Sequence, residues 1–205
     1  MPMPLVKGSS KGSSPGSASA VRPPALDSLD AEARWTAARA LGAHAEAVPA
    51  LGAALKREKV PRVREAIMTA LIRIGDAASV EAVLPYLRSQ DAARRAAAVE
   101  ALQSLPAAIP PFMPVLFNDP DPDVRLLATE LVRNMKASDA TRLLCDLIVS
   151  EQHPNVCAAA VDVLTEVGTL EALPVLEKCA ARFAATPFLP FAISAAIARI
   201  SGAEG

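Results

Sequence analysis

Three cysteines and two histidines are the side chains in this sequence best suited to metal binding or nucleophilic chemistry. Cys145, Cys157 and Cys179 are 12 and 22 residues apart, spacings that match no common zinc pattern. A nucleophilic cysteine needs a neighbouring base and an electropositive setting, whereas all three fit apolar helix faces as small hydrophobic residues. His44 and His153 are isolated at helix ends. We therefore predict no catalytic residue, no metal site and no cofactor.

The acidic run Asp119–Asp123 resembles the start of a calcium-binding loop. It lacks the central glycine and the distal bidentate glutamate of that pattern. We interpret it as a loop followed by a helix N-cap, where acidic side chains are favoured.

Arginine recurs at a nearly constant interval, which indicates an internal repeat. Five ungapped segments begin at Asp30, Val60, Asp91, Asp121 and His153. Their fifth position, the anchor, is Arg34, Arg64, Arg95, Arg125 and Cys157. Positions three, four, six and seven after the anchor are apolar except at Thr129, a spacing that lines one face of an α-helix.

The ends of these helices carry their own signals. Asp30, Asp91 and Asp121 occupy the expected N-cap position, and His153 replaces Asp there in the fifth copy. The next position holds a first-turn proline in three copies, Pro61, Pro122 and Pro154. Three glycines fall near the helix C-termini, at Gly42, Gly75 and Gly168.

A second apolar helix is predicted between successive first helices. The five segments are 45–58, 78–90, 108–118, 138–151 and 170–183, and residues 189–200 look like half of a sixth unit. Short loops join them, as helical hairpins require. The third segment contains Phe112, Met113 and Phe117 among three prolines, which predicts an irregular helix.

The pattern Asp-x-x-Val-Arg-x-x-Ala-Ala-x-Ala-Leu-Gly resembles the short HEAT-like repeats of the phycobilisome-lyase type, best at Asp30–Gly42 and Asp121–Val132. The resemblance implies an all-α, right-handed α-solenoid of about five two-helix repeats plus a terminal half-repeat. It also implies that the anchor arginines pair with the Asp column across adjacent repeats. This structural ladder comprises Asp30, Arg34, Arg64, Asp91, Arg95, Asp121 and Arg125.

Two regions differ in composition. Residues 1–27 are rich in Gly, Ser and Pro, and we predict a disordered tail; the alternative is a docking motif at Met3, Leu5, Val6 and Lys7. Residues 28–205 form the predicted repeat array. Hydrophobic residues make up 52 % of the chain and aromatic residues 3 %, so the core is built from small aliphatic side chains.

Charge and hydropathy exclude some functional classes. The net charge of −1 argues against nucleic-acid binding by phosphate neutralisation. No apolar run reaches the ~18 residues that a membrane span needs. An odd cysteine count without a secretory signal favours a reducing compartment, so we predict a cytoplasmic protein.

Solenoids bind partners along an extended concave surface, here expected to be built from the second helices. Aromatic and arginine side chains are favoured at such interfaces. The candidate contact residues are Glu81, Tyr86, Arg88, Arg142, Asp146, Glu177, Lys178 and Arg182. A solvated helix face is the alternative interpretation.

A repeat array without a catalytic cluster predicts a non-catalytic scaffold or adaptor that binds another protein in bacterial signal transduction. The alternative, implied by the resemblance alone, is a bilin-lyase-like enzyme or regulatory subunit acting on a chromophore-bearing protein. At the C-terminal end, Phe183, Phe188 and Phe191 are expected to close the core. The alternative for these rings is a contact surface for a partner or for a homodimer.

Overall fold

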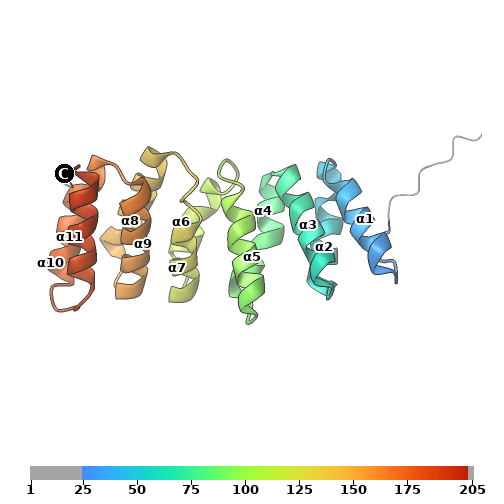
Figure 1. The fold of residues 1–205 in the computed structure, drawn as a ribbon, viewed down its shortest axis with the longest axis horizontal. Coiled ribbons are helices and arrows are strands. Elements are labelled where there is room, and N and C mark those ends of the chain that lie inside the picture. Colours follow the sequence, from blue (N-terminus) through green and yellow to red (C-terminus); the bar gives the residue numbers. More distant parts are fainter. Residues whose placement is uncertain (1–24, 203–205) are drawn as a thin grey trace, which may run out of the picture.

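The computed structural model describes residues 25–202, and within this range the chain forms eleven α-helices and no strand. The helices alternate between two layers along one axis (Figure 1). The first layer contains α1 (Ala31–Leu41), α3 (Pro61–Ile74), α5 (Ala92–Gln103), α7 (Pro122–Glu130), α9 (Pro154–Val167) and α11 (Leu189–Ile200). The second contains α2 (Val48–Arg57), α4 (Ala77–Val83), α6 (Met113–Phe117), α8 (Ala137–Ser150) and α10 (Leu173–Arg182).

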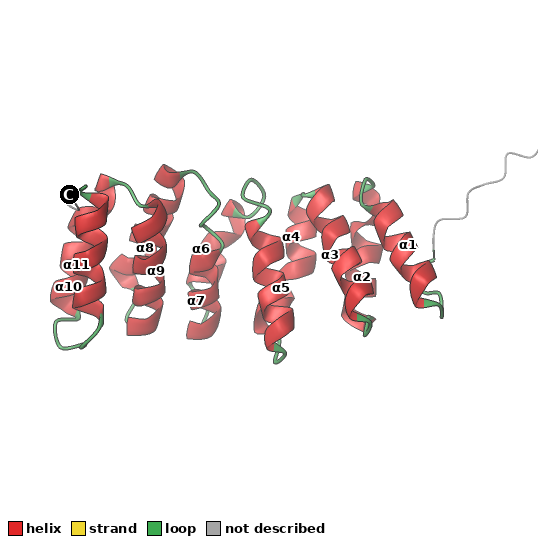
Figure 2. Ribbon diagram, in the orientation of Figure 1, coloured by secondary structure: helices red, strands yellow, loops and turns green. Residues whose placement is uncertain are grey.

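This arrangement confirms the predicted all-α solenoid of five two-helix units and a terminal half-unit, and Figure 2 shows helices joined by short loops. The predicted tail and its alternative docking motif lie outside the described residues, apart from residues 25–27. Leu26, at this boundary, is 9 % exposed and belongs to the core.

The first-layer helices begin where the sequence predicts. The carboxylates of Asp30, Asp91 and Asp121 accept hydrogen bonds from backbone N–H groups of the following turn. His153 occupies the N-cap position of α9, but its side chain makes no capping hydrogen bond, so α9 is not capped as expected. Among the predicted terminal glycines, Gly75 alone has a left-handed conformation, with φ 71°.

Helix α7 ends at Glu130, whereas the repeat pattern extends to Met135. The side-chain amide of Gln103 donates to the Glu130 carbonyl at 2.9 Å, and Asn134 donates to the Gln103 carbonyl at 3.1 Å. This exchange joins the ends of α5 and α7. The Glu130 carbonyl also accepts from the Arg133 N–H at 3.3 Å, in a turn that does not continue the α-helix.

Proline interrupts the second layer. Helix α4 continues beyond Val83 as a tighter 3-10 segment, Leu84–Arg88, which contains Pro85. The third unit has only a 3-10 turn, Pro110–Phe112, and the short helix α6. This agrees with the irregular helix expected there.

The core lies between the two layers and follows the repeat columns. The residues three positions after each anchor are all 0 % exposed: Ala37, Ile67, Ala98, Ala128 and Ala160. Cys157 and Cys179 are also buried. Small side chains allow α1 to pack on α3, α7 on α9 and α9 on α11.

Two expectations about burial are wrong. Ala40 belongs to a predicted core column but is exposed. Phe188 and Phe191 are 48 % and 79 % exposed, and Leu189, Ile193 and Ala196 of α11 close the core instead.

Candidate functional site

A column of polar side chains precedes the first-layer helices and organises the loops between repeats. The residue two positions before each N-cap accepts a hydrogen bond from the N–H of the N-cap residue, at 2.8–3.2 Å. This loop column consists of Ser28, Glu58, Ser89, Asp119 and Glu151. The sequence analysis missed it, although its members recur at the repeat interval.

The anchor arginines pair with the loop column and not with the Asp column. Arg34 contacts both carboxylate oxygens of Glu58, at 2.7 and 3.0 Å, and also donates to the Ser28 carbonyl at 2.8 Å. Arg125 repeats this geometry with Glu151 at 2.6 and 3.0 Å. The Asp side chains cannot take this role because they cap their own helices.

Burial and pairing act in opposite directions on these carboxylates. The hydrogen bond from Arg34 lowers the pKa of Glu58 to about 2, against the effect of burial. Burial raises the pKa of Glu151, but the hydrogen bonds from Arg125 and the following loop outweigh it and leave that pKa lowered. Both glutamates therefore stay ionised, and their role is to fix the stacking of repeats.

The pairing of anchor arginines with carboxylates of the loop column is interrupted in the second and third units. Ser89 replaces the acid expected opposite Arg64, whose side chain donates, among the described residues, only to the Lys59 carbonyl at 3.3 Å. Asp119 forms its ion pair with Arg88 of the second layer. The Arg95 side chain therefore has no carboxylate partner within residues 25–202 and donates to the Ser89 carbonyl at 2.7 Å.

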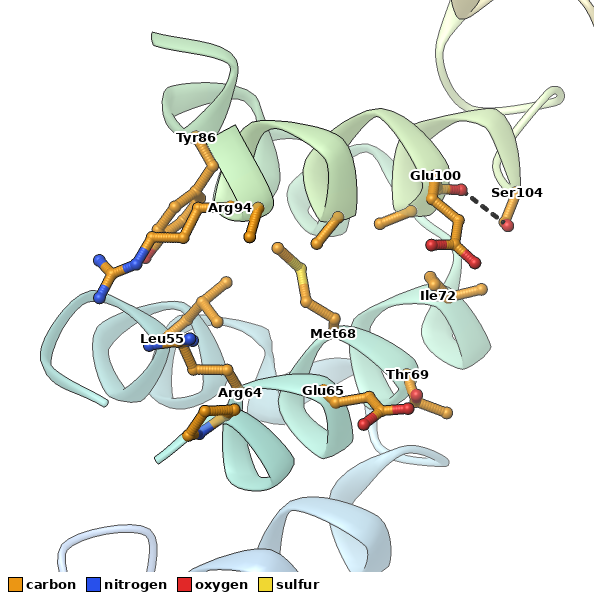
Figure 3. A pocket seen from close by; sticks show the side chains of 14 residues that line it. Leu55, Arg64, Glu65, Met68, Thr69, Ile72, Tyr86, Arg94, Glu100 and Ser104 are labelled. Carbon is orange, nitrogen blue, oxygen red and sulfur yellow. Dashed lines mark hydrogen bonds between the residues drawn. The ribbon is translucent and has the colours of Figure 1, made fainter. Parts of the chain in front are cut away.

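The junction between α3 and α5, beside this break, contains a cleft of about 380 Å³ (Figure 3). Arg94 departs from the repeat, because the same column holds valine in three of the other four copies and Ala33 in the first. Val63, Val124 and Val156 in that column are at most 2 % exposed. An arginine in an apolar column cannot pack in the same way, so this junction departs from the repeat.

Two polar atoms at this end of the cleft are buried without a hydrogen-bond partner among the described residues, the Tyr86 hydroxyl and Arg94 Nε. Figure 3 shows the two side chains together, above Leu55 and Arg64. Tyr86 is 9 % exposed, and burial raises the pKa of its phenol, which therefore remains a neutral donor. Buried polar groups are rarely left unpaired, so this pair needs an explanation.

The rest of the cleft has Met68 in its middle, with Glu65 and Thr69 of α3 along its edge, and Glu100 at its far end (Figure 3). Met68 projects from α3 towards the alanines of α5 (Figure 3). Ala93, Ala97 and Ala101 line that wall, and their short side chains leave the space open. Glu100 lies beyond Ile72, with its backbone carbonyl accepting from the Ser104 hydroxyl at 3.0 Å.

The predicted second-layer contacts fall into two groups. Tyr86 is buried at the cleft, Arg88 pairs with Asp119, and Arg182 donates to the carbonyls of Ile148 and Val149. The other five are exposed and form no hydrogen bond or ion pair within residues 25–202; they are Glu81, Arg142, Asp146, Glu177 and Lys178.

The buried Cys157 and Cys179 lie beside the exposed Arg182 in the fifth unit. Arg182 Nη2 lies 3.8 Å from the Cys157 sulfur and 3.9 Å from the Cys179 sulfur. The Cys157 thiol and Arg182 lower the pKa of Cys179, whereas Cys145, which lies apart from these residues, has its pKa raised to about 11 by burial. Cys157 occupies the anchor position of this unit. Its thiol lies 3.7 Å from the Glu151 carbonyl, as the anchor arginines donate to the loop carbonyls before their own helices.

No group of three or more His, Cys, Asp or Glu side chains suited to a metal ion occurs in the described part of the chain. Across the same residues, no helix is long and apolar enough to cross a membrane.

The two-layer stack and its loop ladder define an α-solenoid repeat protein. A family model described as HEAT repeats matches residues 21–103 and 109–184. The chain therefore belongs to the HEAT repeat family.

One curated relative is "Bilin biosynthesis protein PecE" of Nostoc sp. (strain PCC 7120 / SAG 25.82 / UTEX 2576), 45 % identical over 74 residues, which cover 35 % of this chain. The match spans 29 % of that protein's length. Two engineered proteins of known structure align over 86 % of this chain and 94 % and 96 % of their own, with 17 % and 16 % identity and a TM-score of 0.40 each.

Proposed function

We propose that this protein is a non-catalytic cytoplasmic scaffold or adaptor that binds a partner protein through the second-layer face, in bacterial signal transduction. The observation that carries the proposal is the set of charges along α4, α8 and α10. Glu81, Arg142, Asp146, Glu177 and Lys178 are exposed and unpaired among the described residues. Charged side chains with no internal role are available for a partner.

Two further observations support the proposal. HEAT repeats form extended surfaces suited to protein binding. The cysteines of the array are free thiols, as expected of a protein in a reducing compartment.

Affinity capture from the source cell with the full chain tests this function. One variant carries Arg142→Glu and Lys178→Glu on the second layer. A control of equal charge change carries Arg39→Glu and Arg73→Glu on the first layer, where both side chains are exposed. We expect a stoichiometric protein with the wild type and the control, and its loss with the second-layer variant. Equal recovery by all three would refute the assignment of the face.

A second candidate function is supported by the similarity to the bilin biosynthesis protein PecE. In this alternative, the chain is a bilin-lyase-like enzyme or regulatory subunit that acts on a chromophore-bearing protein. Titration of the protein with a free bilin, followed by visible absorbance, tests it. A saturable spectral change would favour this candidate, and an unchanged spectrum at excess protein would exclude bilin binding by the isolated chain.

A further inference from the structure

We propose that the α3–α5 cleft binds a short segment of the partner protein in which a carboxylate precedes a large apolar side chain; this inference rests on the proposed scaffold function. The site would be separate from the second-layer charges. It would take the carboxylate at its Tyr86 end and the apolar side chain over Met68.

Hydrogen-bond donors without a strong acceptor gather at the Tyr86 end of the cleft. The Tyr86 hydroxyl is buried without a partner among residues 25–202, and Arg64 has no carboxylate partner there. Arg94 Nε forms no hydrogen bond in this range and has only a long ion pair with Asp91. A phenol and two guanidiniums lining one end of a cleft are suited to a carboxylate, which accepts several hydrogen bonds at once. No acid of the described chain takes this place, because Asp91, the neighbour of Arg94, is 3.5 Å from it and caps α5.

Met68, in the middle of the cleft, leaves apolar surface uncovered. Met68 is the largest residue of its column. Met68 and Val99 are only partly buried, whereas Ala38, Thr129 and Val161 in the same column are at most 1 % exposed. The alanines of α5 do not cover Met68. A flexible thioether facing open space is typical of a binding surface that adapts to an apolar side chain.

The length of the cleft and the charge at its far end limit what can occupy it. From Arg64 to Ile72 along α3 the cleft extends for about 12 Å, at 1.5 Å per helical residue. About four residues of extended chain cover that distance. Glu100 at the far end favours a basic side chain or free N–H group there. The occupant is therefore an acid, a large apolar residue, one further residue and a base, in that order.

The chain's own first 24 residues do not match this occupant. They contain Lys7, Lys11 and Arg22 and no acidic residue. A partner segment is the better match to the basic end.

The test uses the full chain and four capped hexapeptides, Gly-Glu-X-Ala-Lys-Gly, in which X is Leu, Met, Ile or Phe. Four matched peptides carry Gln in place of Glu. Methionine methyl groups labelled with ¹³C report binding at Met68 by NMR. We expect at least one acidic peptide to shift the Met68 methyl signal saturably, with at least about tenfold weaker binding of its Gln counterpart.

Two variants locate the contact. Arg94→Val introduces the residue that three other repeats carry at this position, so it should fold at least as well as the wild type and bind at least about tenfold more weakly. Tyr86→Phe removes only the hydroxyl and should weaken binding several-fold. Arg73→Val, on α3 but outside the cleft, is the control and should bind normally.

Absence of a Met68 shift with all acidic peptides at millimolar concentration would overturn the inference, as would equal binding by Arg94→Val. The affinity capture described above distinguishes the two proposals. Capture of a partner without peptide binding rejects the cleft inference alone, whereas failure to capture any partner rejects the scaffold function.

Discussion

At the scale of single residues, the paired glutamates of the loop column connect stability to pH. The anchor arginines are visible in the sequence, but their partners are not, because Glu58 and Glu151 sit at the ends of second helices where nothing marks them as buried. Only 6 % of each is exposed. Their identification requires the chain trajectory, which brings residues 24 and 26 positions apart together.

Replacing Glu58 with Gln should destabilise the protein by about 1–3 kcal/mol at pH 7. The folded-state pKa of Glu58 is about 2, below its ordinary value. Its stabilising contribution is therefore present above an unfolded-state pKa of about 4.3 and is lost as the pH falls towards the folded value. Urea unfolding at pH 7 and pH 3 measures the difference, with Glu81→Gln as the exposed control. A Glu58→Gln effect that stayed constant down to pH 2 would contradict this account.

Replacing Cys157 with Arg restores the anchor type but should destabilise the protein by about 2–4 kcal/mol. Cys157 is 0 % exposed, and Arg182 already occupies the space beside its sulfur. Combining Cys157→Arg with Arg182→Ala should recover part of the loss, because the competing guanidinium is removed. Thermal unfolding of the two single variants and the double variant forms the test. A single variant as stable as the wild type would show that the local packing argument is wrong.

At the scale of elements, amphipathic spacing and capping residues predicted most helices closely. The second-layer segments, for example, were predicted as 138–151 and 170–183. They are observed as Ala137–Ser150, and as a 3-10 turn Leu170–Ala172 followed by the helix Leu173–Arg182. The early end of α7 was not predictable, because it depends on the Gln103 amide of another repeat. The α3–α5 cleft was missed for a similar reason: Arg94 was readable as a departure from a valine column, but the position of Tyr86 beside it was not.

Gly75 tests the helix-end assignment. It has φ 71°, and an added Cβ would come within 3.3 Å of the Ile72 carbonyl oxygen. Gly75→Ala should therefore cost about 1 kcal/mol. Gly202 also has a positive φ, but it follows the last helix and a Cβ there would meet nothing within 4 Å. Gly202→Ala is the control and should have the smaller effect in urea unfolding.

At the scale of the whole molecule, the exposed rings of α11 and its approach loop raise the question of self-association. Phe188 and Phe191 expose 48 % and 79 % of their surface at the end of the array. We predict that the wild type forms a weak dimer at tens of micromolar concentration in sedimentation velocity, and that Phe188→Ser with Phe191→Ser remains monomeric. Val115→Ser and Val149→Ser, which alter other exposed side chains, are the control. A wild type that is monomeric throughout would show that this end is not a dimer contact.

The stacking of repeats gives the molecule two separate surfaces, the charged second layer and the α3–α5 cleft. The two surfaces are proposed for binding on different grounds. The second layer carries charges without an internal partner, and the cleft has buried donors without a strong acceptor. The fold was predictable because every repeat obeys the same columns. The candidate site was not, because it lies where one repeat departs from them.

Hydrogen–deuterium exchange of the full chain with and without its captured partner tests the scaffold assignment most directly. We expect slower exchange on binding in α4, α8 and α10, with α1 and α7 unchanged as internal references. Protection confined to the first layer or the helix ends, with the second layer unchanged, would contradict it.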